Sequence, residues 1–349
     1  MDELPYGVLA ALVGLAGGIV LGLAARLGDF CTLGALESAV YGKDARRLRL
    51  WGVVLGVAIL TTQALALIGW IELENSFYHT IQWNPWASIV GGLVFGYGMA
   101  MAGNCGFGAL VRFGSGDLRS LVVVVVMAII GFIVLSGPLA PLRVLLFPQP
   151  EASGPQGIVH DLGLLGLPAP LTVVLFGVAA LAWGLGYAPL RARPQMIAWG
   201  AAAGLAVSWC FFGTSWLYDH SLGAVQIEGP SFTAPVGRTL IYLMTSTAGG
   251  ITFSVGSVVG VMAGALIGSM IRGLFKWEAC EDPRELGRQV GGAALMGAGG
   301  VVAMGCSVGQ GVSAFAALAW SGPVTLIAIA AGATFGLRRL IGGFQNAVD

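Results

Sequence analysis

Residues 86–105, WASIVGGLVFGYGMAMAGNC, carry no charged side chain and end in glycine, asparagine and cysteine. A run of about 18 or more mainly apolar residues is long enough to cross a bilayer as a helix. The same pattern returns at residues 290–306, VGGAALMGAGGVVAMGC, with a glycine pair near its start and a cysteine at its end. These two stretches predict a helical membrane protein in which a cysteine lies where a spanning helix ends.

Composition extends this prediction to the whole chain. Of its 349 residues, 56% are hydrophobic and only 10% are charged, and the mean hydropathy is +0.85. Because a soluble domain carries about 25% charged residues, this chain could not cover a water-facing surface with polar groups. The formal net charge is zero, which gives no case for nucleic-acid binding. We therefore predict an all-α, polytopic protein in a lipid bilayer.

Nine apolar segments are expected to cross the membrane: Tyr6–Ala25, Leu50–Ile71, Trp86–Ala102, Leu121–Phe147, Pro168–Leu190, Met196–Phe212, Thr239–Met270, Val290–Met304 and Val324–Leu337. The first residues, Met1-Asp2-Glu3, form no positively charged region. We therefore expect the first segment to be a retained helix rather than a cleaved signal peptide.

The distribution of charge orients these segments. Basic residues cluster after the first, fifth, seventh and ninth segments: Lys43, Arg46, Arg47, Arg49, Arg191, Arg193, Arg272, Lys276, Arg284, Arg288, Arg338 and Arg339. The opposite loops hold Glu72, Glu74, Glu151, Asp161, Asp219 and Glu228. Since cytoplasmic loops are enriched in lysine and arginine, the pattern predicts an outside N-terminus and a cytoplasmic C-terminus.

Three glycine-rich segments are too short to cross: Gly28–Tyr41, Gly103–Ser115 and Gly305–Ser321. Each follows a spanning segment, so we expect short re-entrant half-helices that are buried in protein. Ser231, Thr233 and Pro235 mark a polar break that could be a fourth. The two glycine–cysteine motifs follow helices that run in opposite directions. We therefore predict a single transporter domain with an inverted pseudo-repeat, residues 1–165 and 166–349.

Three half-helices begin near a cysteine that a glycine follows three residues later: residues 31–34 (CTLG), 105–108 (CGFG) and 306–309 (CSVG). A helix start presents free N–H groups and a positive dipole end, which together favour anions. A thiol adds a weak donor and a soft sulfur atom that can contact another sulfur. A thiolate would repel a dianion, so passage requires protonated thiols or only transient deprotonation. The pattern predicts a substrate pathway lined by Cys31, Cys105 and Cys306.

Further residues are candidates for a supporting role: Asn104, Gln310, Arg112, Arg238, Cys210 and the glycines Gly34, Gly106, Gly108, Gly305 and Gly309. Alternatives remain open for them, since the amides could satisfy loop backbone and the arginines could extend to an interface. Cys210 could be a small apolar side chain, and Cys280 belongs to a charged loop. Asp29 and Glu37 are expected to cap a helix or to pair with arginine. The histidines His79, His160 and His220 lack metal-ligand spacing, so no metal site is predicted.

Residues 28–36 (GDFCTLGAL), Asn104-Cys105-Gly106 and Met304-Gly305-Cys306 resemble the YeeE/YedE family of bacterial membrane proteins. The resemblance covers nearly the whole chain. It implies an hourglass-shaped helical protein of the cytoplasmic (inner) membrane, with nine spans and short central helices. It further implies that Cys31, Cys105 and Cys306 pass thiosulfate inward through transient S–H···S contacts, without a large rocking motion. A cytoplasmic sulfur-carrier protein of the TusA type would be the partner, and no such domain is expected within this chain.

Other functions stay open from sequence alone. The substrate could be another sulfur or selenium species, or the protein could be a channel for another small solute. A membrane sulfurtransferase that carries a cysteine persulfide is the enzymatic alternative. No general base adjoins these cysteines and no C-x-x-C pair exists, so we expect a transporter without a cofactor rather than an enzyme.

Overall fold

The computed structural model describes residues 5–247, 249–279 and 283–345. Helices make up 74% of the structure, and its described part contains no strand, which confirms the predicted all-α fold. The helices are α1 (Tyr6–Leu27), α2 (Thr32–Val40), α3 (Arg46–Leu67), η1 (Leu73–Asn75), α4 (Phe77–Thr80), α5 (Pro85–Ala102), α6 (Gly106–Gly114), α7 (Leu118–Leu135), α8 (Ala140–Leu146), α9 (Ile158–Leu164), α10 (Ala169–Leu185), α11 (Ala188–Arg191), α12 (Pro194–His220), α13 (Ala234–Thr245), α14 (Phe253–Ile271), α15 (Pro283–Val302), the π-helical turn η2 (Gly309–Ala314) and α16 (Ser321–Gln345).

Seven segments of the described residues are long and apolar enough to cross a membrane, and they contain α1, α3, α5, α7, α12, α14 and α16. This confirms the polytopic membrane class. Two further helices coincide with predicted spans: α10, which has 17 residues, and α15, whose first turns carry charged side chains. If α10 and α15 also cross the membrane, the total is the predicted nine spans; this total stays a prediction.

Three predicted spans are wrong in their extent, because each joins two helices; one of them, Pro168–Leu190, runs past the end of α10 into α11. Thr239–Met270 is not one helix, because α13 ends at Thr245 and α14 begins only at Phe253. The segment between them contains Ser246 and a glycine pair, and such residues weaken a helix. Leu121–Phe147 is likewise divided, since α7 ends at Leu135 and the sequence Ser136-Gly137-Pro138 separates it from α8. Proline lacks the N–H group that a continuing helix would need.

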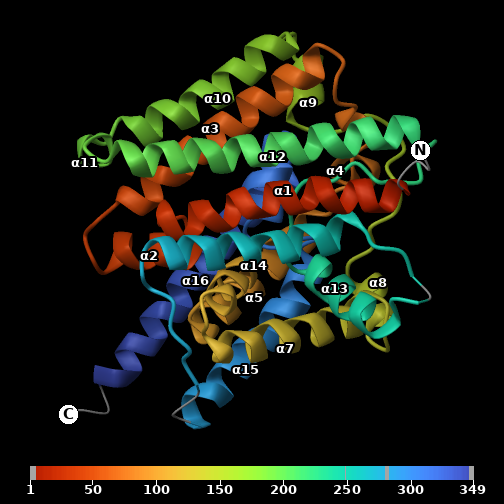
Figure 1. Ribbon diagram of the computed structural model, residues 1–349. Coiled ribbons are helices and arrows are strands. Elements are labelled where there is room, and N and C mark those ends of the chain that lie inside the picture. Colours follow the sequence, from red (N-terminus) through yellow and green to blue (C-terminus); the bar gives the residue numbers. More distant parts are fainter. Residues whose placement is uncertain (1–4, 248, 280–282, 346–349) are drawn as a thin grey trace.

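The long helices lie in layers (Figure 1). Helix α1 lies between α12 and α14, α3 packs against α10 and α12, and α5 packs against α15 and α16. The short helices α2 and α11 lie at one end of the molecule, together with the C-terminal end of α16. The N-terminus, α4, α8 and α13 lie at the opposite end. We call these the α2 end and the α13 end.

Glycine allows the closest of these helix contacts. Gly14 and Gly18 on α1 contact the backbone of α14, and Gly256 and Gly260 on α14 contact the backbone of α1, so the contact glycines are four positions apart on each helix. A Cβ on Gly14 would lie 2.5 Å from the carbonyl oxygen of Phe253. Small residues at this spacing let two membrane helices approach until their backbones touch. Much of the high glycine content therefore serves packing.

The three predicted half-helices are present as short helical segments that start inside the protein. Helix α5 ends at Gly103, whose φ of 73° is left-handed, and α6 then begins after Cys105 in extended conformation. Helix α2 begins after Cys31 in the same way. In the third segment α15 ends before Met304, which has a φ of 60°, and η2 follows Cys306 by a short turn. A motif cysteine thus stands at or shortly before the start of each short helical segment.

Candidate functional site

The Cys306 thiol is fully buried and surrounded by hydrogen-bond donors. Its Sγ accepts hydrogen bonds from the N–H groups of Phe232, at 3.2 Å, and Gly309, at 3.4 Å. The Ser231 hydroxyl lies 4.0 Å from the same sulfur. The loop before α13 therefore closes over the start of the third half-helix. Two backbone donors and a hydroxyl converge on one sulfur atom.

The Cys105 thiol connects the other two cysteine segments. Its Sγ accepts the N–H of Gly108 at 3.3 Å and lies 3.9 Å from Thr32 Oγ1, the residue after Cys31. Thr32 donates in turn to the hydroxyl of Ser307, the residue after Cys306, at 2.9 Å. Cys105 also interacts electrostatically with both Cys31 and Cys306. The structure thus brings the three cysteine segments, far apart in sequence, together in the core, with the Cys105 thiol hydrogen-bonded to hydroxyls that stand next to the other two cysteines.

Cys31 lies at the beginning of α2 and is partly exposed, unlike the other two. Basic groups surround it, since Arg47 and Arg112 both interact with it electrostatically. Asp29, two residues earlier, forms ion pairs with Arg47 at 3.7 Å and Arg272 at 3.3 Å. Pairing with arginine was one of the two roles expected of Asp29. Cys31 thus lies next to a positively charged surface at the α2 end.

Three phenylalanines accompany the thiols. Phe30 precedes Cys31, Phe107 follows Cys105 by two positions, and Phe232 donates its N–H to Cys306. Their rings form a row with centroid distances of 6.1 Å for Phe30–Phe107 and 5.2 Å for Phe107–Phe232. All three are buried. The three rings therefore fill apolar space beside the cysteine segments.

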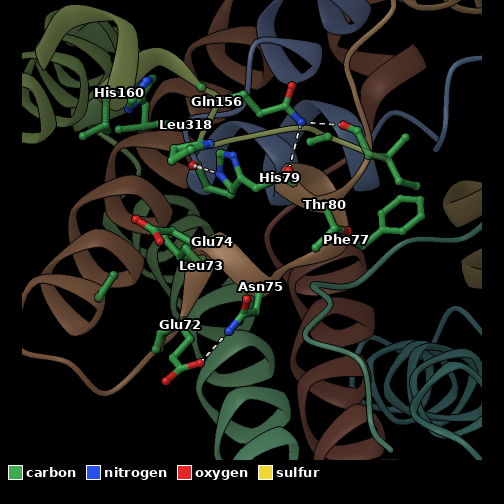
Figure 2. Close-up of a pocket in the computed structure, with 18 of the residues that line it drawn as sticks. Glu72, Leu73, Glu74, Asn75, Phe77, His79, Thr80, Gln156, His160 and Leu318 are labelled. Atoms are coloured by element: carbon green, nitrogen blue, oxygen red, sulfur yellow. Dashed lines mark hydrogen bonds between the residues drawn. The ribbon is translucent and has the colours of Figure 1, made fainter. Parts of the chain in front are cut away.

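Two adjoining cavities open at the α13 end. The larger has a volume of 1520 Å³, and Figure 2 shows part of its lining, including Glu72, His79 and Gln156. The side chain of Gln156 donates to the backbone oxygen of His79 at 3.0 Å, and His79 Nε2 lies 3.0 Å from the carbonyl oxygen of Ala317. The second cavity, of 510 Å³, shares Arg238 with the first. It also reaches Ser231 and Gly305, which flank the Cys306 thiol.

The two candidate amides are buried next to the cysteines. Asn104 is 4% exposed and Gln310 is fully buried. Gln310 donates to the carbonyl oxygen of Met304 at 2.9 Å. The side-chain oxygens of both amides have no hydrogen-bond partner among the described residues. A buried polar atom without a partner is costly, so these two acceptor oxygens mark polar positions beside the cysteines that the described residues leave unsatisfied.

The candidate glycines shape the space around the thiols. Gly108 and Gly309 supply the N–H groups described above, and a Cβ on Gly309 would collide with the Ser231 side chain. A Cβ on Gly106 would lie 3.0 Å from the Phe232 carbonyl oxygen, and one on Gly34 would lie 2.9 Å from the Arg47 guanidinium. A Cβ on Gly305 would lie 3.1 Å from the Gln310 side chain. Larger residues would disturb the backbone next to each sulfur.

Other candidates lie away from these three thiols. Cys210 is buried within α12 and packs with Ala10, Leu217 and Phe253 in a separate apolar cluster. Arg238 lies at the α13 end, whereas the exposed Arg112 lies near Cys31. Cys280 lies outside the described residues. The structure therefore brings together the three motif cysteines and places the two arginines at opposite ends of this group.

Several groups at the site were not predicted. Thr32 and Ser307 form the hydroxyl link, and the Phe232 N–H reaches Cys306 from a distant loop. The position of Thr32 and Ser307 directly after motif cysteines is a signal that could have identified them. The Phe232 contact uses only backbone, which leaves no signature in a sequence.

An all-helical chain with seven segments, among the described residues, that are long and apolar enough to cross a bilayer is a polytopic membrane protein. The family model described as Sulphur transport matches residues 27–335. The chain belongs to this sulphur-transport (YeeE/YedE) family, which confirms the resemblance.

Two curated relatives carry the name Thiosulfate transporter TsuA. The protein from Escherichia coli (strain K12) is 24% identical over 329 residues, which cover 90% of each chain. The protein from Spirochaeta thermophila is 24% identical over 332 residues, which cover 90% of this chain and 95% of the relative. The similarity therefore extends over most of each chain, at modest identity.

Proposed function

We propose that this protein takes up thiosulfate across the cytoplasmic membrane along the line Cys306, Cys105 and Cys31. The observation that carries the proposal is the hydrogen-bonded chain from the Cys105 thiol through Thr32 to Ser307, which brings together the three segments that begin at these cysteines. The two relatives named as thiosulfate transporters support the choice of substrate. In this orientation the α13 end faces outward and the α2 end faces the cytoplasm, as the basic loops predict.

The outer part of the pathway attracts and holds the anion. Arg238 borders both cavities and supplies positive potential at the entrance. At Cys306 the N–H groups of Phe232 and Gly309 can turn from the thiol to the sulfonate oxygens, since backbone N–H groups at a helix start bind anions well. The protonated thiol then contacts the terminal sulfur of thiosulfate.

The inner part repeats this contact twice. Cys105 has its own N–H donor from Gly108, so the terminal sulfur can pass to it without loss of donors. Cys31 receives the ion next and exposes it to Arg47 and Arg112 at the cytoplasmic surface. No covalent bond changes, so the protein acts as a transporter rather than an enzyme. A cytoplasmic sulfur carrier of the TusA type would take the ion there.

Uptake of sulfur-labelled thiosulfate into cells that lack other sulfate and thiosulfate importers tests this function. We expect saturable uptake that unlabelled thiosulfate abolishes and unlabelled sulfate leaves nearly unchanged. The same cells with and without a TusA-type carrier show whether the partner is required. Uptake of a labelled selenium species or of sulfite, with no uptake of thiosulfate by a folded protein, would reassign the substrate.

A further inference from the structure

A carboxylate lies at the mouth of the proposed pathway, and the proposed transport along the cysteines does not use it. Glu228 belongs to the loop before α13, three residues before Ser231, and 21% of its side chain is exposed. Its backbone is fixed to α12 by two hydrogen bonds with the Thr214 hydroxyl, at 3.2 and 3.3 Å. The carboxylate is therefore held in place beside the 510 Å³ cavity.

Glu228 forms only a weak ion pair with Arg238, a cation that the incoming substrate anion would also use. Its Oε2 lies 3.9 Å from Arg238 Nη1, which is long for an ion pair, and Arg238 also donates to Ser254 at 3.3 Å. A second arginine, Arg143, lines the same cavity, and its buried Nε has no hydrogen-bond partner among the described residues. The cavity thus has cationic donors that remain unsatisfied.

The charged and titratable groups around Glu228 belong to four elements. Besides Arg238 on α13 and Arg143 on α8, these are the Tyr78 hydroxyl on α4 and the Cys210 thiol on α12, with Cys306 beyond Tyr78. Burial raises the pKa of Tyr78, which stays neutral. The carboxylates Glu72, Glu74 and Glu151 and the imidazoles His79 and His160 line only the larger cavity. Among the described residues that line the smaller cavity, Glu228 is the one carboxylate.

We propose that Glu228 is a proton-binding site that competes with the substrate anion for Arg238, so that the outer cavity captures thiosulfate together with a proton. The inference deepens the proposed function and rests on it. With Glu228 ionised, the cavity holds two cations and one anion, and a dianion meets a repelling carboxylate. Protonation removes that repulsion and frees Arg238. Burial raises the pKa of the Glu228 carboxyl, so its proton can exchange at milder acidity than that of an exposed glutamate.

Coupling of this kind is reciprocal: if a proton strengthens anion binding, the anion strengthens proton binding by the same factor. Thiosulfate itself remains a dianion over the neutral pH range, so a pH dependence of its affinity must come from the protein. Protonation of Glu228 changes the binding of thiosulfate in the outer cavity and should therefore change KM. The maximal rate depends on later steps at the cysteines and should change less.

The test is the KM for labelled thiosulfate uptake at external pH of roughly 5 and 8, an interval that starts near the ordinary glutamate pKa and extends in the direction in which burial shifts it. We expect the wild-type KM to be about fivefold or more lower at the acid pH, a coupling of ordinary size. Glu228→Gln should give a low KM at both. Asp219→Asn, which removes an exposed carboxylate outside both cavities, should keep the wild-type dependence.

Calorimetric titration of the purified wild-type protein with sodium thiosulfate, in two buffers of different protonation enthalpy, gives an independent measure that needs no variant. We expect net proton uptake on binding. A wild-type KM that is the same at both pH values, no proton uptake on binding, or an unchanged pH dependence in Glu228→Gln would each overturn the inference. Absence of any thiosulfate uptake or binding by folded wild-type protein would instead reject the proposed function itself.

Discussion

At the residue scale, the proposed pathway depends on backbone N–H groups that converge on sulfur. Cys105 accepts one such hydrogen bond and Cys306 accepts two. Each donor belongs to a glycine or to a loop that glycines allow to come close. The sulfur atoms therefore lie where an anion would be bound even without them.

Gly309→Ala tests this arrangement. Because the added Cβ would collide with Ser231, the N–H donor and the Cys306 thiol must move apart. We expect thiosulfate uptake to fall by at least about tenfold, since small displacements at a reacting centre are costly. Gly163→Ala is the matched control, because a Cβ there meets no atom within 4 Å. Equal uptake by both variants, at equal amounts of folded protein, would contradict the role of this donor.

His79 should make the outer surface sensitive to acid. Burial lowers the pKa of its imidazole, so the folded protein binds the proton less readily than the unfolded chain does. Its contribution to stability is therefore present above the unfolded pKa of about 6.5 and is lost as the pH falls below it.

We expect the melting temperature of the wild type to fall more between neutral and acid pH than that of His79→Gln, whose amide can still donate to Ala317. Fluorescence-monitored unfolding of both proteins across this range measures the difference. Parallel pH profiles would show that His79 does not titrate on unfolding.

Sequence predicted the sulfur atoms of the site but not all of its donors. Cys31, Cys105 and Cys306 were identifiable because a cysteine followed by glycine recurs at three helix starts. The Phe232 N–H and the Glu228 carboxylate were not, since a loop brings each to the site from a remote part of the chain. Only the tertiary structure shows which loop covers which half-helix.

At the element scale, hydropathy found the membrane segments but not where helices break inside them. The predicted span Thr239–Met270 joins α13 and α14 because its average hydropathy stays apolar across the residues that separate the two helices. The short helices at the cysteines were predictable, since glycine and cysteine mark their starts. The closeness of α1 and α14 was indicated only by composition, because a glycine pattern does not name its partner helix.

Gly256→Ala tests the α1–α14 contact. A Cβ at this position would collide with the backbone of Ala11, and backbone cannot move as a side chain can. We expect a loss of stability of about 2 kcal/mol or more, seen as a lower melting temperature and a smaller yield of monodisperse protein. Gly287→Ala on α15, where a Cβ has free space, should change stability by only a few tenths of a kcal/mol.

At the scale of the whole molecule, the helix contacts support the inverted repeat that we propose. In this scheme α1, α2 and α3 correspond to α12, α13 and α14, and α5, α6 and α7 correspond to α15, η2 and α16. Each close contact among these helices then has an equivalent contact made by the corresponding helices. Thus α1 with α14 corresponds to α12 with α3, and α5 with α16 corresponds to α15 with α7. Helices α1 and α12 run in opposite directions (Figure 1). Cys105 and Cys306 become partners in this scheme, and α10 has no counterpart.

The proposed orientation predicts which loops face the outside. We expect Asp219→Cys to react with a membrane-impermeant maleimide on intact cells, and Lys43→Cys to react only after permeabilisation. The wild-type protein gives the background from its own cysteines. Labelling of Lys43→Cys on intact cells would invert the topology and, with it, the proposed order of the thiols.

The central claim is that thiosulfate passes from thiol to thiol, and Cys105 is the thiol that connects the other two. The most direct measurement is uptake of sulfur-labelled thiosulfate by the wild type, Cys105→Ser and Cys210→Ser at equal expression, where Cys210 is a buried cysteine in a separate cluster. The account predicts that Cys105→Ser retains less than about a tenth of wild-type uptake, a loss of 1.4 kcal/mol or more, while Cys210→Ser transports normally. Normal uptake by Cys105→Ser would contradict it.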